Sequence, residues 1–565
     1  MTARSIPIIA APEVRQRRRA TPKGRRVEPQ ALDELQQLLG PTEHSRDLLI
    51  EYLHKLQDHF GHLSARHLAA LAQQMRLAQT EVYEVASFYH HFDIVKEGDA
   101  APPRLTVRVC DGLSCELAGA GPLLDTLPAL LGSAVRVIAA PCIGRCEQAP
   151  AVAVGQHALA QATPESVCAA VQAGRTAAAP ARGIDFDAYR RDGGYALLAR
   201  CIAGELQVEP VIEALEHSGL RGLGGAGFPA GRKWRIVRNE PAPRLMAVNI
   251  DEGEPGTFKD RVYLEHSPHR FLEGMLIAAW AVGIARVYLY LRDEYHGCRA
   301  MLEAELAKLR ERPPWPGMPQ IELRRGAGAY ICGEESAMIE SIEGKRGLPR
   351  LRPPYVAQVG LFGRPTLEHN FETLYWVRDI LEKGGAWFAA QGRHGRKGHR
   401  SFSVSGRVRE PGVKLAPAGI TARELIDEFC GGMADGHAFY AYLPGGASGG
   451  ILPASMADIP LDFDTLQPHG CFIGSAAVVV LSDADSAVGA ARNLMRFFEH
   501  ESCGQCTPCR NGTAKASALI AMPKWDLELL ADLSQVMRDA SICGLGQAAP
   551  NPVDCVIKYF PQELA

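Results

Sequence analysis

The sequence predicts a multidomain α/β protein, and three features of the chain support this prediction. The chain has 565 residues and 47% hydrophobic content, which is more than a single hydrophobic core usually organises. Strand-like segments alternate with segments of helical periodicity. A linker rich in alanine and proline, residues 176–183, separates two regions that each contain both patterns. We therefore expect several packed domains joined by short connections.

The N-terminal part of the chain combines a basic arm with a helical segment. Residues 1–45 include the run RQRRR at 15–19, and we expect a flexible arm because such a charged segment cannot bury enough apolar surface. Docking onto an acidic partner is the alternative role. Residues 46–98 carry Leu53, Leu56 and Phe60 at helical spacing, which predicts a small helical bundle.

Residues 99–176 predict a compact α/β domain with four cysteines at the ends of strands. The strand-like segments 104–110 and 134–139 run into Cys110-x4-Cys115 and Cys142-x3-Cys146. Two thiolates after each of two strands suit a [2Fe–2S] cluster. Zinc is the competing metal, although zinc sites prefer cysteines at tighter spacing along the chain. The remaining interpretation is that the four cysteines are structural and bind no metal.

The rest of the chain predicts three further regions. Residues 177–400 read as a large α/β domain, in which 276–291 fits a buried helix running into a strand. Residues 401–483 mix strands with a short helix at 421–430 and glycine-rich turns. Residues 484–565 read as helices.

The segment ESCGQCTPCRNGT, residues 501–513, holds Cys503, Cys506 and Cys509, which is one thiolate short of a closed site. Cys543 follows in SICGLG, and a helical hairpin between them would bring it back to the triplet. A three-plus-one set suits a [4Fe–4S] cubane, in which each iron takes one thiolate. Zinc is the alternative metal, and Cys555 is the less favoured fourth ligand.

Three loops of the large α/β domain are candidates for nucleotide binding. GLGGAG, residues 222–227, satisfies G-x-G-x-x-G but follows a helical pattern and so lacks the Rossmann context. With Arg232 and Lys233 behind it, the loop could still hold phosphate, or it could be only a tight turn. DEGEPG, residues 251–256, follows a buried strand and predicts ribose contacts, a solvated turn or a metal site. GAGAYICGEE, residues 326–335, leads into a helix. The two acids of this loop would suit the first turn of that helix, because a helix N-terminus favours negative charge.

Composition narrows the class of protein and its location. The net charge is −3, from 61 basic and 64 acidic residues, so no global field favours nucleic acid or an anionic membrane. We find no uncharged apolar run of about 18 residues and no secretory signal pattern. Fifteen cysteines without such a signal favour thiolate–metal chemistry in a reducing compartment. We therefore expect a cytoplasmic protein.

Together these motifs resemble the flavin subunit of the NADH dehydrogenase module of respiratory complex I. The segments GLRGLGGAGFP, NIDEGEPGTFKD, GAGAYICGEE and ESCGQCTPCR carry the resemblance. The N-terminal half resembles the thioredoxin-like [2Fe–2S] subunit of the same module, here fused in front. The resemblance implies a helical bundle with a thioredoxin-like domain, a Rossmann-like FMN and NAD domain, a ubiquitin-like β-grasp domain and a C-terminal helical bundle with the [4Fe–4S] cluster.

The resemblance also implies two sets of nucleotide-binding residues. The positions that match FMN contacts are Gly222, Gly224, Gly225, Lys233, Asn249, Asp251, Glu252, Tyr330, Gly333, Glu334, Asn370 and Thr373. The positions that match contacts to the nicotinamide nucleotide are Phe228, Glu254, Tyr330, Glu335, Arg352 and Tyr355. Arg352 and Tyr355 stand where relatives often have Lys and Phe. Leu223 and His369 stand where relatives often have Arg and Asn, so the phosphate or flavin contacts of these two positions are expected to differ.

The fused layout is similar to the diaphorase subunits of NAD-linked formate dehydrogenases and NAD-reducing hydrogenases. Leu223 and the run YLPGGASGGILPASM, residues 442–456, most resemble the β subunit of tungsten- or molybdenum-dependent formate dehydrogenases. This implies an NAD(H)-dependent flavin and iron–sulfur oxidoreductase whose large partner subunit carries a pterin-bound metal and further clusters. Electrons from formate would pass through the [4Fe–4S] cluster and FMN to NAD⁺, or in reverse for CO₂ reduction. The alternatives are a flavin subunit of a hydrogenase or of NADH:quinone oxidoreductase, and a non-enzymatic zinc or assembly protein.

Overall fold

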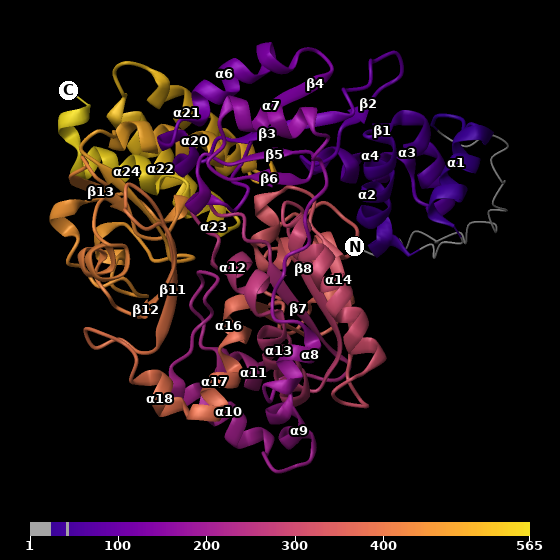
Figure 1. The fold of residues 1–565 in the computed structure, drawn as a ribbon, viewed down its shortest axis with the longest axis vertical. Coiled ribbons are helices and arrows are strands. Elements are labelled where there is room, and N and C mark those ends of the chain that lie inside the picture. The colour runs from indigo at the N-terminus through magenta and orange to yellow at the C-terminus, as the bar shows by residue number, and fades with distance from the viewer. Residues whose placement is uncertain (1–23, 41–44, 565) are drawn as a thin grey trace, which may run out of the picture.

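The computed structural model describes residues 24–40 and 45–564 and has five packed parts (Figure 1). The basic run at 15–19 lies outside the described residues. In the described part of the chain, no helix is long and apolar enough to cross a membrane.

The N-terminal part is a helical bundle that begins earlier than the sequence predicts. Its helices are α1 (Pro29–Leu39), α2 (Leu49–Phe60), α3 (Ala65–Met75) and α4 (Gln79–Phe88), with a short parallel pair of β1 (Leu63–Ser64) and β2 (Ile94–Val95). Ala31 and Leu35 of α1 are fully buried, and α1 packs on α2 and α3. The expectation of an arm up to residue 45 is therefore wrong for α1, because this helix buries an apolar stripe of its own.

The second part is a four-stranded mixed sheet with helices beside it. The strands are β3 (Leu105–Cys110), β4 (Val135–Ala140), β5 (Val152–Val154) and β6 (His157–Leu159), in the order β4-β3-β5-β6. β3 and β4 are parallel, while β5 and β6 add antiparallel strands. The helices are α5 (Leu113–Leu117), α6 (Ala120–Leu131) and α7 (Pro164–Gln172). This is a thioredoxin-like arrangement.

The third and largest part is a parallel sheet with helices on both sides. The strands are β7 (Arg244–Ile250), β8 (Ile284–Leu291), β9 (Gln320–Arg325) and β10 (Thr366–Asn370), and all neighbours run parallel in the order β10-β7-β8-β9. The helices are α8 (Phe186–Arg191), α9 (Ala196–Ile202), α10 (Val208–Ser218), α11 (Ala230–Arg238), α12 (Lys259–His266), α13 (Pro268–Val282), α14 (His296–Glu311), α15 (Glu335–Ile342), α16 (Phe371–Tyr375), α17 (Val377–Lys383) and α18 (Gly385–Ala389). β7 is a continuous buried run from Leu245 to Val248, as expected for a strand covered on both faces.

The fourth part is a β-grasp sheet in the order β12-β11-β15-β13-β14. The strands are β11 (His399–Gly406), β12 (Gly412–Pro417), β13 (Phe439–Leu443), β14 (Leu452–Pro453) and β15 (Ala477–Ser482), with the short helix α19 (Ala422–Glu424). β11 and β15 are parallel central strands, and the other pairs are antiparallel.

The fifth part is helical and packs against the β-grasp sheet and the thioredoxin-like domain (Figure 1). Its helices are α20 (Ala487–Glu501), α21 (Thr507–Ala521), α22 (Leu527–Ala540), α23 (Gly544–Ala548) and α24 (Asn551–Tyr559). α20, α21 and α22 pack in succession, which folds the chain back toward the loop that joins α20 to α21.

Candidate functional site

The carboxyl ends of β7 and β10 form the point at which the parallel sheet changes winding direction. From β7 the chain adds β8 and β9 on one side and then crosses to place β10 on the other. Ligands of open α/β sheets bind in the crevice outside such a point. Asn249 is the last residue but one of β7, Asn370 ends β10, and these two residues are paired across the strands. The topology therefore locates a ligand crevice at the two candidate asparagines.

The glycine loop lies at the same crevice, between α10 and α11. The backbone N–H of Leu223 donates to Thr373 Oγ1 over 2.9 Å, and a Cβ on Gly224 would come within 3.0 Å of Asn370 Cβ. Gly225 has φ +121°, a conformation that side chains rarely allow. The loop thus presents bare backbone to the crevice, as a phosphate-binding turn requires.

The loop after β7 contains an acidic group without a partner. Asn249 Nδ2 donates to Gly333 O over 2.8 Å, and Asn249 Oδ1 accepts from the backbone of Asp251 over 3.0 Å. Asp251 Oδ2 is buried and has no hydrogen-bond partner among the described residues. Burial raises the pKa of Asp251 well above its usual value. An unsatisfied acceptor beside a backbone cradle fits a ligand that brings a donor, such as the ring N–H or ribityl hydroxyls of FMN.

Lys233 provides the cation of the crevice. Its Nζ lies 3.0 Å from Glu368 O and 3.3 Å from Glu368 Oε2. Burial raises the pKa of Glu368, and its charged neighbours include Lys233, Glu335 and Glu334. Lys233 on α11 and the acids at the start of α15 are therefore close enough to interact electrostatically with Glu368, and a phosphate could take the place of the Glu368 carboxylate at Lys233.

Two of the residues expected at FMN use their carboxylates inside the protein. Glu252 accepts from the backbone N–H groups of Asp260 (2.8 Å) and Arg261 (3.1 Å) at the start of α12, and from the hydroxyl of Tyr295 over 2.8 Å. Glu334 accepts from the first backbone N–H groups of α15 and pairs with Arg352. Both side chains satisfy helix N-termini, so a flavin would meet the backbone of these two residues.

The residues expected to hold the nicotinamide nucleotide are exposed rings, an ion pair and one bonded carboxylate. Phe228 and Tyr355 are exposed aromatic side chains, and Glu335 Oε1 is 2.8 Å from Arg352 Nη2. Glu254 instead bonds to Tyr330 Oη and accepts from the backbone N–H of Ser448 over 2.7 Å. These residues thus offer rings for stacking, charged groups for polar contacts and, at Glu254, a carboxylate that reaches Ser448 of the β-grasp domain.

The two departures from the expected motif are accommodated by packing. His369 Nε2 accepts from Trp234 Nε1 over 2.8 Å in the buried core, and the Leu223 side chain is buried. The Leu223 backbone still bonds to Thr373. Neither replacement opens the crevice.

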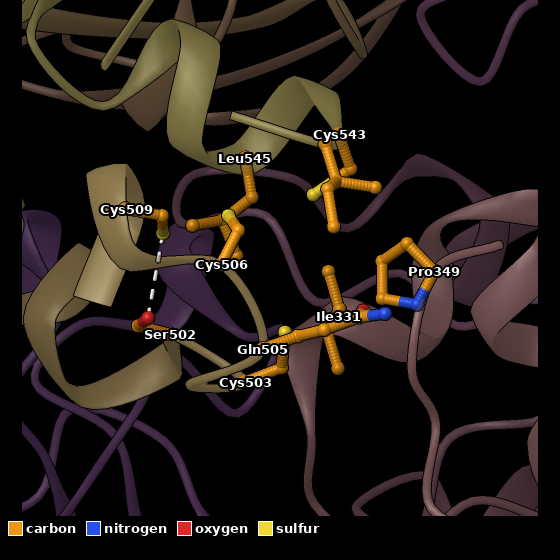
Figure 2. Close-up of a pocket in the computed structure, with 10 residues that line it drawn as sticks. Ile331, Pro349, Ser502, Cys503, Gln505, Cys506, Cys509, Cys543 and Leu545 are labelled. Atoms are coloured by element: carbon orange, nitrogen blue, oxygen red, sulfur yellow. Dashed lines mark hydrogen bonds between the residues drawn. The ribbon is translucent and has the colours of Figure 1, made fainter. Parts of the chain in front are cut away.

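Four cysteines of the C-terminal helical part line one cavity (Figure 2). Cys503 and Cys506 lie in the loop after α20, Cys509 lies in the first turn of α21, and Cys543 precedes α23. The helical hairpin α21–α22 brings Cys543 to the triplet, and Cys555 is not among the lining residues. Ser502 Oγ lies 3.3 Å from Cys509 Sγ. Four converging sulfurs fit a [4Fe–4S] cluster in number and kind.

Burial favours the neutral thiol form of Cys503, Cys509 and Cys543. Burial raises the pKa of Cys509 to about 11 and that of Cys543 to about 12. Coordination to iron deprotonates a thiol outright. The backbone N–H groups of Leu545 and Gly546 lie at Cys543 and favour its thiolate. A Cβ on Gly546 would come within 2.8 Å of Cys509 Cβ, so the close approach of α23 to Cys509 requires glycine at this position.

The flavin crevice and the four-cysteine cavity share a wall. Ile331 lines the cavity (Figure 2). The hydroxyl of its neighbour Tyr330 bonds to Glu254, which lies in the loop after β7. The backbone N–H of Tyr330 donates to Glu501 Oε2 over 2.8 Å, and the Tyr330 ring packs on Phe497 at 5.0 Å between centroids. Glu501, which the sequence interpretation missed, therefore links the loop that contains Tyr330 to the segment that carries the first cysteine. Its only signal in the sequence is its place before the first cysteine.

The second set of cysteines converges in the thioredoxin-like domain. All four are buried; Cys142 Sγ and Cys146 Sγ are 3.3 Å apart, and Cys110 interacts with Cys115 and Cys142. Cys110 is the last residue of β3 and Cys142 lies just after β4, so each pair begins at the end of a parallel strand, as the sequence predicts. The set fits a [2Fe–2S] cluster.

Two arginines dock this cysteine cluster on the flavin domain, and the sequence interpretation missed both. Arg292 Nη2 donates to Cys142 O over 2.6 Å, and Arg261 Nε donates to Gly144 O over 2.9 Å. Arg292 also bonds to the backbone carbonyl of Glu252. Nothing local in the sequence distinguishes these arginines, because their partners in the cysteine loop lie more than a hundred residues away.

Comparison with known proteins matches each of these sites to a described domain. Residues 215–379 match the Nuo51 FMN-binding domain, residues 35–175 match the thioredoxin-like [2Fe-2S] ferredoxin, and residues 489–565 match the NADH-ubiquinone oxidoreductase-F iron-sulfur binding region.

Whole-chain comparisons agree with the domain matches. The chain is 40% identical over 390 residues to an NADH-quinone oxidoreductase subunit of Rhizobium meliloti (strain 1021), which covers 66% of this chain and 92% of that protein. It is 40% identical over 373 residues to the mitochondrial NADH dehydrogenase [ubiquinone] flavoprotein 1 of Dictyostelium discoideum, covering 63% and 78%. A chain in the crystal structure of an NAD⁺-reducing [NiFe]-hydrogenase in the H₂-reduced state superposes with a TM-score of 0.81 at 33% identity, covering 92% and 93%.

The fold, the crevice and the two cysteine sets therefore have one explanation. The protein is a flavin and iron–sulfur oxidoreductase acting with NAD(H), and its cofactors are FMN, a [2Fe–2S] cluster and a [4Fe–4S] cluster. The chain belongs to the family of NADH dehydrogenase flavoproteins that includes the Rhizobium and Dictyostelium proteins, here joined to a thioredoxin-like [2Fe–2S] domain.

Proposed function

We propose that this chain is the diaphorase subunit of an NAD-dependent formate dehydrogenase in the cytoplasm. In this role it passes electrons between NAD(H) and a large partner subunit that carries tungsten or molybdenum on a pterin. The observation that carries the diaphorase role is the shared wall between the flavin crevice and the four-cysteine cavity at Tyr330 and Ile331. Leu223 and the run at residues 442–456 support formate as the partner's substrate by resemblance.

The chain's own residues would position each group. The backbone of Gly222, Gly224 and Gly225 would receive the FMN phosphate, with Lys233 supplying the positive charge. Asn249, Asp251, Gly333, Asn370 and Thr373 would hold the ribityl chain and ring. When bound, FMN exchanges two electrons with NAD(H) and single electrons with iron–sulfur clusters.

The nicotinamide nucleotide would bind at the mouth of the crevice. Phe228 and Tyr355 offer exposed rings for stacking, and the Glu335–Arg352 pair offers polar contacts. Glu254 and Tyr330 close the inner end next to the β-grasp domain. Closure by these groups would keep water from the reacting rings.

The cysteines would hold the two clusters. Cys503, Cys506, Cys509 and Cys543 would bind the [4Fe–4S] cluster beside the flavin loop. Cys110, Cys115, Cys142 and Cys146 would bind the [2Fe–2S] cluster, which Arg292 and Arg261 hold against the flavin domain.

Changing Glu254 to Gln is expected to raise the KM for NADH about 3- to 10-fold, which corresponds to roughly 0.7–1.4 kcal/mol, the net contribution of one ordinary hydrogen bond. The two carboxylate oxygens of Glu254 accept hydrogen bonds from the Ser448 backbone N–H and from the Tyr330 hydroxyl. A glutamine side chain has only one oxygen, so it cannot accept both. Steady-state oxidation of NADH with ferricyanide measures the effect. Glu311→Gln, an exposed residue of α14, is the control. Unchanged kinetics in Glu254→Gln would remove Glu254 from the nucleotide site.

A second candidate function is the diaphorase of an NAD⁺-reducing hydrogenase. The superposition on such an enzyme over 92% of this chain favours it. Both functions assign the same chemistry to this chain and differ only in the partner.

Purification of the native complex decides between the two partners. A formate dehydrogenase predicts a large partner with pterin, bound tungsten or molybdenum, and NAD⁺ reduction by formate. A hydrogenase predicts nickel in the partner and NAD⁺ reduction by H₂. A complex with nickel and no formate activity would refute the proposed partner while leaving the diaphorase role intact.

A further inference from the structure

A cavity of about 240 Å³ lies behind the glycine loop, where the flavin domain meets the β-grasp domain. Its walls come from the segment before the loop, from the connection into β11, and from the loop that contains Asp462 and Phe463. Leu223 contributes to the wall, but the residues assigned above to FMN and NAD do not. This cavity is therefore separate from the nucleotide crevice.

The cavity is lined by more positive than negative charge. Its cationic side chains are those of Arg221, Arg396, Lys397 and Arg400, and its acidic side chain is that of Asp462. Arg396 Nε and Arg400 Nη2 share the carboxylate of Asp462 at 2.7 and 2.8 Å. One carboxylate leaves an excess of cations around the space.

Arg400 is the least satisfied of these cations. Its exposed fraction is 3%, and its Nε and Nη1 are buried without a hydrogen-bond partner among the described residues. Its guanidinium lies 4.3 Å from the centroid of the Phe463 ring, and the Arg221 guanidinium lies 4.4 Å from the same centroid. A buried, partly unpaired cation beside another cation is unfavourable unless an anion completes it.

We propose that this cavity binds a small organic phosphate. A phosphate dianion would pair with Lys397 at the entrance, and a small rotation of the Arg400 side chain would turn its free N–H groups toward the anion. The cavity is larger than one phosphate group, and Leu220, Leu223 and Phe388 add apolar walls. These walls suit a small organic portion attached to the phosphate.

Residues that line the cavity also contact the glycine loop directly. Arg221 donates to Gly227 O and pairs with Asp464 over 2.7 Å. A Cβ on Gly227 would meet the Phe463 ring at 2.6 Å, so this ring packs directly against the loop. An anion that orders Arg400 and Phe463 would therefore also steady the turn that faces the FMN crevice.

Calorimetric titration with phenyl phosphate tests the site on the full-length holoprotein. FMN and NAD⁺ are kept saturating so that neither nucleotide site is open to the probe. We expect one equivalent of phenyl phosphate to bind, with inorganic phosphate binding more weakly and acetate more weakly still. No heat from phenyl phosphate, or equal affinity for acetate, would overturn the proposal.

Three variants locate the bound probe. Lys397→Gln removes an exposed lysine at the cavity and is expected to raise the Kd at least 5-fold without loss of fold. Lys524→Gln removes an exposed lysine of the C-terminal part, and its Kd should stay within 2-fold of wild type. Arg400→Lys keeps the charge but loses the free donors, so its Kd should also rise at least 5-fold. Equal Kd values in wild type and Lys397→Gln would place the probe elsewhere and refute the assignment.

Discussion

Changing Cys543 to Ala is expected to remove the C-terminal cluster while FMN stays bound. Cys543 is the sulfur that the α21–α22 hairpin brings to the triplet, and without it one iron of the cubane has no thiolate. The crevice residues are untouched. Electron transfer to the partner should fall by about 100-fold or more, since even outer-shell changes at metal sites cost about 10- to 100-fold. NADH oxidation by ferricyanide should persist.

EPR of the dithionite-reduced protein and its flavin content measure this result. Cys555→Ala is the matched control, because Cys555 is a buried cysteine of the same helical part that pairs with Cys471 at 3.5 Å. It should keep the [4Fe–4S] signal. An intact [4Fe–4S] signal in Cys543→Ala would refute the ligand assignment.

Changing Gly225 to Ala is expected to weaken FMN binding by about 10-fold or more. The backbone of Gly225 has φ +121°, and forcing a side chain into such a region costs roughly 1–3 kcal/mol. The loop would relax by moving its backbone out of the crevice. Fluorescence titration of the apoprotein with FMN measures the Kd.

Gly436→Ala is the control for this variant. Gly436 also has a positive φ, +79°, and a Cβ there would meet no atom within 4 Å. It lies in an exposed turn of the β-grasp domain and should carry a similar backbone strain without loss of FMN affinity. If both variants bind FMN as wild type does, the glycine loop is not the phosphate-binding turn.

The sequence predicts the convergence of the cysteines because their spacing reflects local structure. Cys110 ends a strand and Cys142 follows one, so parallel pairing of β3 and β4 alone brings their loops together. The return of Cys543 needs only a helical hairpin. The apolar run of β7 likewise fixes where the acidic loop begins.

The sequence interpretation is wrong or incomplete where a residue's role depends on contacts far along the chain, or where the composition of a whole segment hides a short helix. The acids of the loop after β7 look alike in the sequence, yet Glu252 caps α12 while Glu254 reaches Ser448, 194 residues away. Helix α1 lies within a segment whose basic composition predicts an arm. Its buried residues Ala31 and Leu35 show the i, i+4 spacing of a helix, but only packing on α3 reveals their partner.

The bond from the Tyr330 backbone to Glu501 implies that the flavin pocket is completed late during synthesis of the chain. Glu501 and Phe497, which hold the flavin loop, and Ser448, which holds Glu254, are all synthesised after the sheet of the flavin domain is complete. Domains generally fold in order during synthesis. We expect the ribosome-bound flavin domain to lack a finished pocket until the C-terminal helices dock. Such a delay would keep an unfinished chain from binding flavin and passing electrons to oxygen before its clusters are in place.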